Sequence, residues 1–176
     1  MGIKYIIRFI IFLIAVFIVI FLISLLLPSK VTVSKSVDIN ASEEAVSNQI
    51  VNFEEWKNWY PAFKDENISI IKNPPAVNTL ASVTLKDRNG KSITLLLIDT
   101  SKQTININLQ SASSTKVSYQ FIMIPKINNQ VQLTWNVNTN LGWLPWKKME
   151  GILLDKFSGN QYEAALENLR KAAENN

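Results

Sequence analysis

The chain has 176 residues, with 18 lysines and arginines against 14 acidic residues, and it contains no histidine and no cysteine. Their absence excludes histidine general bases, cysteine nucleophiles, disulfides and the usual zinc sites. The net charge of +4 comes from scattered lysines, and the five glycines are dispersed, so the sequence shows neither a nucleic-acid-binding patch nor a phosphate loop.

The first predicted element is an apolar helix. Residues 9–27 contain no charge, proline or glycine, and as a helix they would span ~28 Å, close to the thickness of a bilayer core. The segment is longer than the core of a signal peptide, and the bulky sequence SLLLPSK that follows offers no small-residue cleavage site. A buried core helix would carry a polar stripe, which is absent here. We therefore predict an uncleaved membrane anchor over residues 1–29, with the transmembrane helix at about 6–27.

The orientation of this anchor rests on a small difference in charge. Lys4 and Arg8 precede the apolar segment, and Lys30 and Lys35 follow it. With the α-amino group added, the positive-inside rule slightly favours a cytoplasmic amino terminus. We expect a single-pass protein whose remaining residues lie outside the cytoplasm, and the lack of cysteine is compatible with that compartment.

Residues 30–176 suit one domain with a sizeable core, because they show no linker, repeat or low-complexity tract. Residues 31–39 alternate as a strand does, and Ser42 then makes a good helix N-cap, followed by Glu43 and Glu44 in the first turn. The aromatic stretch NFEEWKNWYPAFKDEN follows at residues 52–67 and predicts a second short helix that ends at Pro61.

Six further strands are predicted at 67–72, 79–87, 91–100, 104–110, 115–124 and 130–139. Asn89-Gly90 and Asn128-Asn129 are typical of tight hairpin turns. In the last strand Val131, Leu133, Trp135 and Val137 face one way and polar residues face the other. This alternation indicates an antiparallel sheet that is covered on one side only.

The C-terminal segment is the expected cover of that sheet. Tyr162, Leu166, Leu169 and Ala173 recur at helical spacing and form an apolar stripe. Residues 144–157 are predicted to form a helical segment that precedes the long helix, with a break at Ser158 and Gly159 between the two. A curved sheet around a long helix leaves a natural ligand site between the two.

The order and spacing of several short motifs resemble a known superfamily. The motifs are INASEEAV at 39–46, W-x-x-W-x-P at 56–61 and D-x-x-x-G-x-x-x-E-x-x-L-x-x-L at 155–169, carried by Ile39, Asn40, Ala41, Val46, Trp56, Trp59, Pro61, Asp155, Gly159, Glu163, Leu166 and Leu169. This pattern is similar to the START/polyketide-cyclase-like superfamily with its helix-grip fold, and it is most similar to membrane-anchored bacterial members that are polyketide cyclase/dehydrase-like.

The resemblance implies an α+β fold in which a seven-stranded antiparallel sheet grips a long C-terminal helix, here preceded by one transmembrane helix. It also implies an apolar cavity for lipids, sterols, polyketides or other hydrophobic molecules. Some members of the superfamily are enzymes, and many have no known activity.

Strand alternation and the helical stripe select the residues expected to line that cavity. They are Leu95, Leu97, Ile107, Leu109, Tyr119, Phe121, Leu133, Trp135, Tyr162, Leu166 and Leu169. Core packing alone would select the same residues. The entrance candidates are Trp59, Tyr60, Trp143 and Trp146.

Two aromatic clusters allow a structural and a functional interpretation. Trp56 and Trp59 are expected to plug one end of the sheet, although Trp59, Tyr60 or Phe63 could instead line a cavity mouth and touch ligand or lipid headgroups. Trp143 and Trp146 are expected to form a packed connection, with a mobile entrance as the alternative. Lys147 and Lys148 beside them are expected to be ordinary surface charges, although acidic lipid headgroups could bind them.

Lys35 falls on the same side of its strand as the valines, where an unpaired buried charge is costly. Either it lies at the open end of the cavity, as a polar handle for an acidic ligand, or a bulge turns it outward. Because a basic residue is common at this point in the superfamily, we expect the bulge.

Three functions fit the sequence. The favoured one is a membrane-anchored binder of a hydrophobic small molecule or lipid. The second is a cyclase- or dehydratase-type enzyme, for which Tyr119 and Lys35 are the available polar groups. The third is an envelope interaction protein whose cavity is filled by Phe121, Met123 and Trp135. No catalytic constellation, metal site or cofactor is predicted, and protein partners are not predictable.

Overall fold

The structure is a computed structural model that describes residues 2–64, 67–74, 78–101, 103–112 and 115–175. The elements in chain order are α1 (Gly2–Leu26), β1 (Lys30–Ile39), α2 (Glu43–Val51), α3 (Trp56–Trp59), the 3-10 helix η1 (Pro61–Phe63), β2 (Ser69–Asn73), β3 (Ala81–Lys86), β4 (Ser92–Thr100), β5 (Thr104–Ser111), β6 (Lys116–Lys126), β7 (Gln130–Asn140), α4 (Pro145–Ile152) and α5 (Leu154–Glu174). The predicted order of strand, short helices, six strands and long helix is confirmed.

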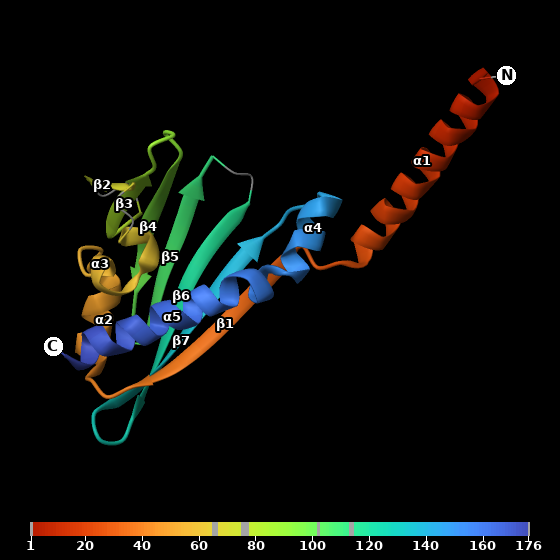
Figure 1. Cartoon of the computed structure of the whole chain (residues 1–176). Coiled ribbons are helices and arrows are strands. Elements are labelled where there is room, and N and C mark those ends of the chain that lie inside the picture. Colours follow the sequence, from red (N-terminus) through yellow and green to blue (C-terminus); the bar gives the residue numbers. More distant parts are fainter. Residues whose placement is uncertain (1, 65–66, 75–77, 102, 113–114, 176) are drawn as a thin grey trace.

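α1 is an apolar helix that projects away from the rest of the chain (Figure 1). Its 25 residues make it long and apolar enough to cross a membrane. Large apolar side chains are exposed along most of its length, while Ser24 in its last turn is buried. By length and composition α1 can be a membrane anchor or a signal sequence.

The seven strands form one antiparallel sheet in the order β1-β7-β6-β5-β4-β3-β2. Consecutive strands from β2 to β7 are neighbours, and β1 is added beside β7, with which it pairs along its whole length. The turn between β6 and β7 places Asn128 and Asn129 at positive φ, as expected for a tight hairpin. β1 and β2 are therefore the two edges of the sheet.

α5 lies across one face of this sheet (Figure 1) and packs against β1, α2 and α3. Its buried residues recur at helical spacing, with Leu166, Leu169 and Ala173 facing the sheet as predicted. Tyr162 is partly buried on the same side. Alternate residues of β7, from Val131 to Val137, are buried beneath the helices, so the core lies between the inner face of the sheet and α2, α3 and α5.

The predicted helix break at Ser158 and Gly159 is wrong. α4 and α5 are separated at Leu153, and both predicted break residues lie inside α5. Gly159 is buried there, and a Cβ on it would lie 3.2 Å from Lys35 Nζ and 2.7 Å from Asp155 Oδ1. The glycine therefore gives space to a neighbouring side chain and does not end the helix.

Candidate functional site

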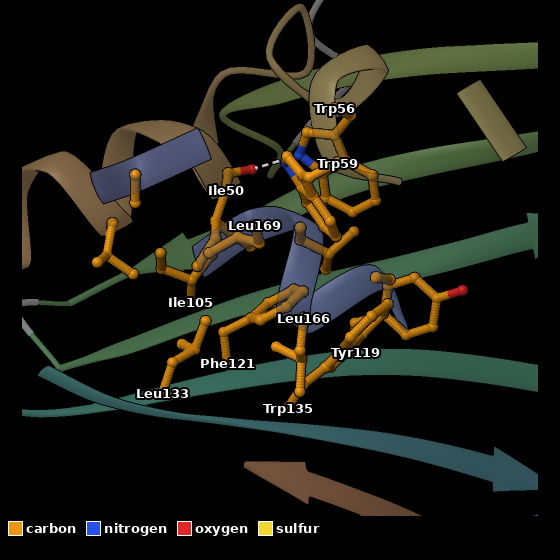
Figure 2. Packing of buried hydrophobic residues seen from close by; sticks show 14 of the residues in the cluster. Ile50, Trp56, Trp59, Ile105, Tyr119, Phe121, Leu133, Trp135, Leu166 and Leu169 are labelled. Atoms are coloured by element: carbon orange, nitrogen blue, oxygen red, sulfur yellow. Dashed lines mark hydrogen bonds between the residues drawn. The ribbon is translucent and has the colours of Figure 1, made fainter. Parts of the chain in front are cut away.

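Two tryptophans of α3 join the short helices to the core (Figure 2). Trp56 and Trp59 have no exposed surface, and their indole N–H groups donate to the carbonyl oxygens of Ile50 (2.8 Å) and Gln49 (3.0 Å). Both carbonyls belong to the last turn of α2, where helix carbonyls lack partners within the helix. The pair packs the interior and caps α2, as the structural interpretation expects. Trp59 has no exposed surface in this conformation, and its role at an entrance stays a prediction.

Aromatic rings occupy the centre of the space between the sheet and the helices. Phe121 and Trp135, from neighbouring strands, stack with centroids 5.0 Å apart, and Tyr162 of α5 meets the Trp135 ring edge-on at 5.0 Å. The Trp59 ring of α3 also meets Phe121 and Trp135 edge-on, with centroid distances of 6.4 and 6.0 Å. These rings connect α3, the sheet and α5 into one core.

The residues predicted to line a cavity meet on the inner face of the sheet and on α5. Those that are buried are Leu95, Leu97, Ile107, Tyr119, Phe121, Leu133, Trp135, Leu166 and Leu169, and those partly buried are Leu109 and Tyr162. In this conformation they pack against one another as core. Their contact with a ligand stays a prediction.

Polar atoms are also present within this apolar interior. The hydroxyls of Tyr60 and Tyr119 lie 3.0 Å apart, within hydrogen-bonding distance. Burial raises the pKa of both phenols above the ordinary value, and burial also raises the pKa of Tyr162 to about 12. Among the described residues, Trp135 Nε1 has no hydrogen-bond partner. In the described part of the chain, the interior thus holds the neutral phenols of three tyrosines and the unpaired indole N–H group of Trp135.

Lys35 does not turn outward, and the expected bulge is wrong. β1 pairs with β7 without a register shift, and Lys35 stands opposite Trp135. Its ammonium group lies 2.9 Å from Glu163 Oε1 and 3.2 Å from Asp155 Oδ1. The hydrogen bond to Glu163 is the larger cause of a raised pKa of Lys35, and the hydrogen bond to Asp155 adds to it. Two carboxylates from α5 compensate the inward charge, which a strand pattern alone cannot reveal.

An apolar hollow, here called the edge pocket, lies between the short helices, the edge strand β2 and its neighbour β3. Its volume is about 540 Å³, and it is lined by Val51, Asn52, Phe53, Glu54, Lys57, Phe63, Ile70, Lys72, Asn73, Leu80, Ala81, Ser82 and Val83. Phe53 and Phe63 connect it to the core, since their ring centroids lie 5.3 and 5.4 Å from that of Trp56. An ion pair between Lys72 and Glu54 lies among its lining residues.

A larger hollow, here called the polar groove, lies at the end of the sheet where β1 begins. It has a volume of about 840 Å³ and is lined by Lys30, Val31, Thr32, Asn108, Leu109, Gln110, Ser111, Thr115, Lys116, Val117, Ser118, Asn138, Thr139 and Asn140. Amides, hydroxyls and two lysines predominate in this lining. Leu109 is the predicted cavity residue that it contains.

The remaining entrance candidates differ in their surroundings. Trp143 and Trp146 are exposed between β7 and α5, whereas Tyr60 is partly buried against the core. Lys147 donates to Thr115 Oγ1 at 3.0 Å. Lys148 is buried, and its ammonium donates to the Ser24 carbonyl of α1 at 3.0 Å. The expectation that Lys148 is an ordinary surface charge is therefore wrong.

Sequence reasoning does not find the edge pocket, because it selects inward residues of long strands and the central helix stripe. The pocket is built instead from the ends of short elements brought together by the fold. Phe63, named from the sequence as an alternative ligand contact, is the one signal that points to it. In the part of the chain that the structure describes, no group of three or more acidic side chains is placed to hold a metal ion.

The fold defines the class of this protein as helix-grip, since a seven-stranded antiparallel sheet wraps a long C-terminal helix. The family model described as polyketide cyclase/dehydrase and lipid transport matches residues 30–174. The chain belongs to this family. No curated protein sequence matches it significantly.

Solved structures agree with this fold. The Zhui aromatase/cyclase from Streptomyces sp. R1128 has a TM-score of 0.62 and 12% identity, with 82% of this chain and 94% of that chain covered. A START superfamily protein from Mycobacterium smegmatis has a TM-score of 0.53 and 20% identity, covering 82% and 95%. A protein from Chromobacterium violaceum has a TM-score of 0.58 and 10% identity, covering 82% and 98%. At sequence identities of 10–20%, these similarities show that the proteins share a fold and show nothing about a shared activity.

Proposed function

We propose that this chain is a membrane-anchored protein that binds a hydrophobic small molecule or lipid. In this proposal α1 is the anchor, and residues 30–176 form the ligand-binding domain on the extracytoplasmic side. Lys4 and Arg8 before the apolar segment support this orientation under the positive-inside rule.

The observation that carries the proposal is the edge pocket. Its volume of about 540 Å³ falls within the range of roughly 300–1,000 Å³ that is typical of small-molecule sites. Valine, leucine, isoleucine and phenylalanine side chains form much of its wall, so burial of an apolar ligand would supply most of the affinity. Phe53 and Phe63 contact Trp56, which in turn contacts Phe121, one of the interior residues predicted to line a cavity, so movement of these rings would extend the site inward.

The charged residues at the pocket suggest the other end of the ligand. Lys57 and Lys72 are exposed lining residues, and Glu54 pairs with Lys72. An anionic ligand group could replace Glu54 as the partner of Lys72. We therefore expect an apolar molecule with one acidic or hydrogen-bond-accepting end, which agrees with the lipid transport named in the family description.

A cyclase- or dehydratase-type enzyme is the second candidate. The Tyr60 and Tyr119 hydroxyls favour it, because neutral phenols can donate hydrogen bonds to the carbonyl oxygen of a reactive chain. A solved structural neighbour is an aromatase/cyclase. This candidate predicts that a carbonyl-bearing ligand is recovered chemically changed, whereas the binding protein returns its ligand unchanged.

Two substitutions on β2 test the proposal. Ile70 lines the edge pocket, whereas its neighbour Ile71 does not, and both side chains are 45% exposed. The full chain would be purified in mild detergent, and organic extracts would be examined by mass spectrometry. We expect a lipid or apolar metabolite with the wild type and with Ile71→Trp, and its loss with Ile70→Trp because the new ring fills the pocket.

Equal ligand recovery from both variants would contradict the edge pocket as the binding site. Extracts without any bound molecule, even after incubation with a lipid mixture, would contradict ligand binding itself. The filled-interior interaction protein would then be the better account, since Phe121, Met123 and Trp135 are all buried.

A further inference from the structure

Six large apolar side chains form an exposed stripe on α4, on the loop before it and on the first turn of α5. This stripe, called the interfacial stripe, consists of Trp143, Trp146, Met149, Ile152, Leu153 and Phe157. Trp143 and Phe157 are more than two-thirds exposed, at 72% and 71%. Trp146, Met149 and Ile152 recur every three residues along α4, so they share one face of that helix, and Leu153 and Phe157 follow at its C-terminal end. Clustered exposed apolar groups of this kind mark an interaction surface.

The opposite side of α4 is fixed to the domain. Gly151 and Pro145 are buried, and a Cβ on Gly151 would approach both Leu141 and Val31. α4 therefore cannot rotate to bury the stripe without losing this packing. The stripe faces away from the core because the small residues of α4 occupy the contact with the sheet.

α4 is also attached to the end of α1. The buried Lys148 ammonium donates to the Ser24 carbonyl at 3.0 Å, in the last turn of α1. A cation at this position also interacts favourably with the helix dipole. In Figure 1, α4 lies beside the domain-proximal end of α1, whereas the β6–β7 turn lies at the opposite end of the sheet. The stripe thus begins where the exposed apolar surface of α1 ends, at Leu25 and Leu26.

We propose that the interfacial stripe inserts into the headgroup–acyl boundary of the same bilayer that α1 crosses. Tryptophan and phenylalanine are well suited to this boundary, and an amphipathic helix can lie in its plane. The charges beside the stripe balance, since the partly buried Lys147 and the exposed Lys156 stand against the exposed Glu150 and Asp155, so apolar insertion provides the attraction. The inference depends on α1 being the membrane anchor of the proposed function, and it adds a second contact that orients the domain.

Tryptophan quenching tests this placement in the full chain. The protein would be reconstituted into phosphatidylcholine vesicles whose acyl chains are brominated either near the headgroup or near the chain ends, so that bromine lies at the membrane boundary or at the bilayer centre. Trp56, Trp59 and Trp135 are fully buried, so Trp143 and Trp146 are the tryptophans exposed to such lipid. We expect clear quenching of the wild type relative to vesicles without bromine, and loss of most of it in the Trp143→Phe/Trp146→Phe variant.

Two added tryptophans serve as depth controls in that double variant. Phe17→Trp lies near the middle of α1 and is expected to be quenched by bromine near the chain ends, whereas Ile127→Trp lies in the distant β6–β7 turn and is expected to be quenched by neither lipid. If Phe17→Trp is quenched but the native tryptophans are not, the stripe does not insert, although anchoring stands. If Phe17→Trp is not quenched, anchoring by α1 fails and the inference fails with it. Equal quenching at Ile127→Trp would also overturn the inference, since contact with lipid would then not be confined to the stripe.

Discussion

At the scale of single residues, the tryptophans of α3 and β7 share burial but differ in hydrogen bonding. Trp59 donates to the Gln49 carbonyl, whereas Trp135 Nε1 has no partner among the described residues. An unpaired buried donor costs roughly 1–3 kcal/mol, while a typical internal hydrogen bond contributes about 1 kcal/mol. The same substitution at the two positions should therefore have different effects.

We predict that Trp59→Phe lowers the free energy of unfolding by about 2 kcal/mol more than Trp135→Phe. Both changes remove similar volume from fully buried sites, but Trp59→Phe also leaves a carbonyl of α2 unpaired. Urea denaturation of the full chain in mild detergent, followed by circular dichroism of the sheet, measures the difference. Equal losses would show that indole hydrogen bonding does not distinguish the two sites.

Individual residues also show what the sequence could predict. Alternation correctly selects the inward residues of the strands, because a sheet that is buried on one face requires an apolar side chain at every second position of each strand. Alternation also gives the side on which Lys35 lies, but not its partners. Asp155 and Glu163 are more than a hundred residues away in sequence, and only the docking of α5 brings them to the ammonium group.

At the scale of elements, two helical glycines have different neighbours. A Cβ on Gly151 would lie 2.1 Å from Leu141 Cδ1 and 3.2 Å from Val31 Cγ2, inside the contact between α4 and β1. A Cβ on Gly159 would instead meet the ends of the Lys35 and Asp155 side chains. These charged ends are partly exposed and can move, whereas Leu141 is buried.

We predict that Gly151→Ala lowers the free energy of unfolding by about 1 kcal/mol, while Gly159→Ala is nearly neutral. Overpacking costs roughly 1–3 kcal/mol, and alanine recovers about 1 kcal/mol of helix propensity at either site. Thermal and urea denaturation of the two variants provide the comparison. A larger loss for Gly159→Ala would mean that the Lys35 ion pairs hold α5 more firmly than the packing of α4.

The elements themselves were largely predictable, because periodicity, N-caps and Asn-rich turns are local signals. The separation of α4 from α5 was not, since Ser158 and Gly159 look like a helix end in the sequence alone. Gly159 lies inside α5, where the absence of a side chain leaves space for Lys35 from another element. The edge pocket is likewise a property of how short elements meet, and no single segment contains its signal.

At the scale of the whole molecule, the anchor and the edge pocket are associated with opposite edges of the sheet. β1 follows α1 directly, whereas β2 and β3 form the pocket wall. Six strand spacings of about 4.8 Å place β1 and β2 about 29 Å apart along the sheet. We therefore expect the ligand to enter the pocket away from the lipid that contacts α1 and the interfacial stripe.

Photocrosslinking in the full chain tests the central claim of ligand binding most directly. A fatty acid with a diazirine in its acyl chain would be added to the reconstituted protein, irradiated, and located by peptide mass spectrometry. We predict labelling within residues 51–63, 70–73 and 80–83, which contain the pocket walls, and suppression of that labelling by Ile70→Trp but not by Ile71→Trp. Labelling confined to α1 and the interfacial stripe would contradict the account, because the probe would then report contact with the bilayer and no ligand site in the domain.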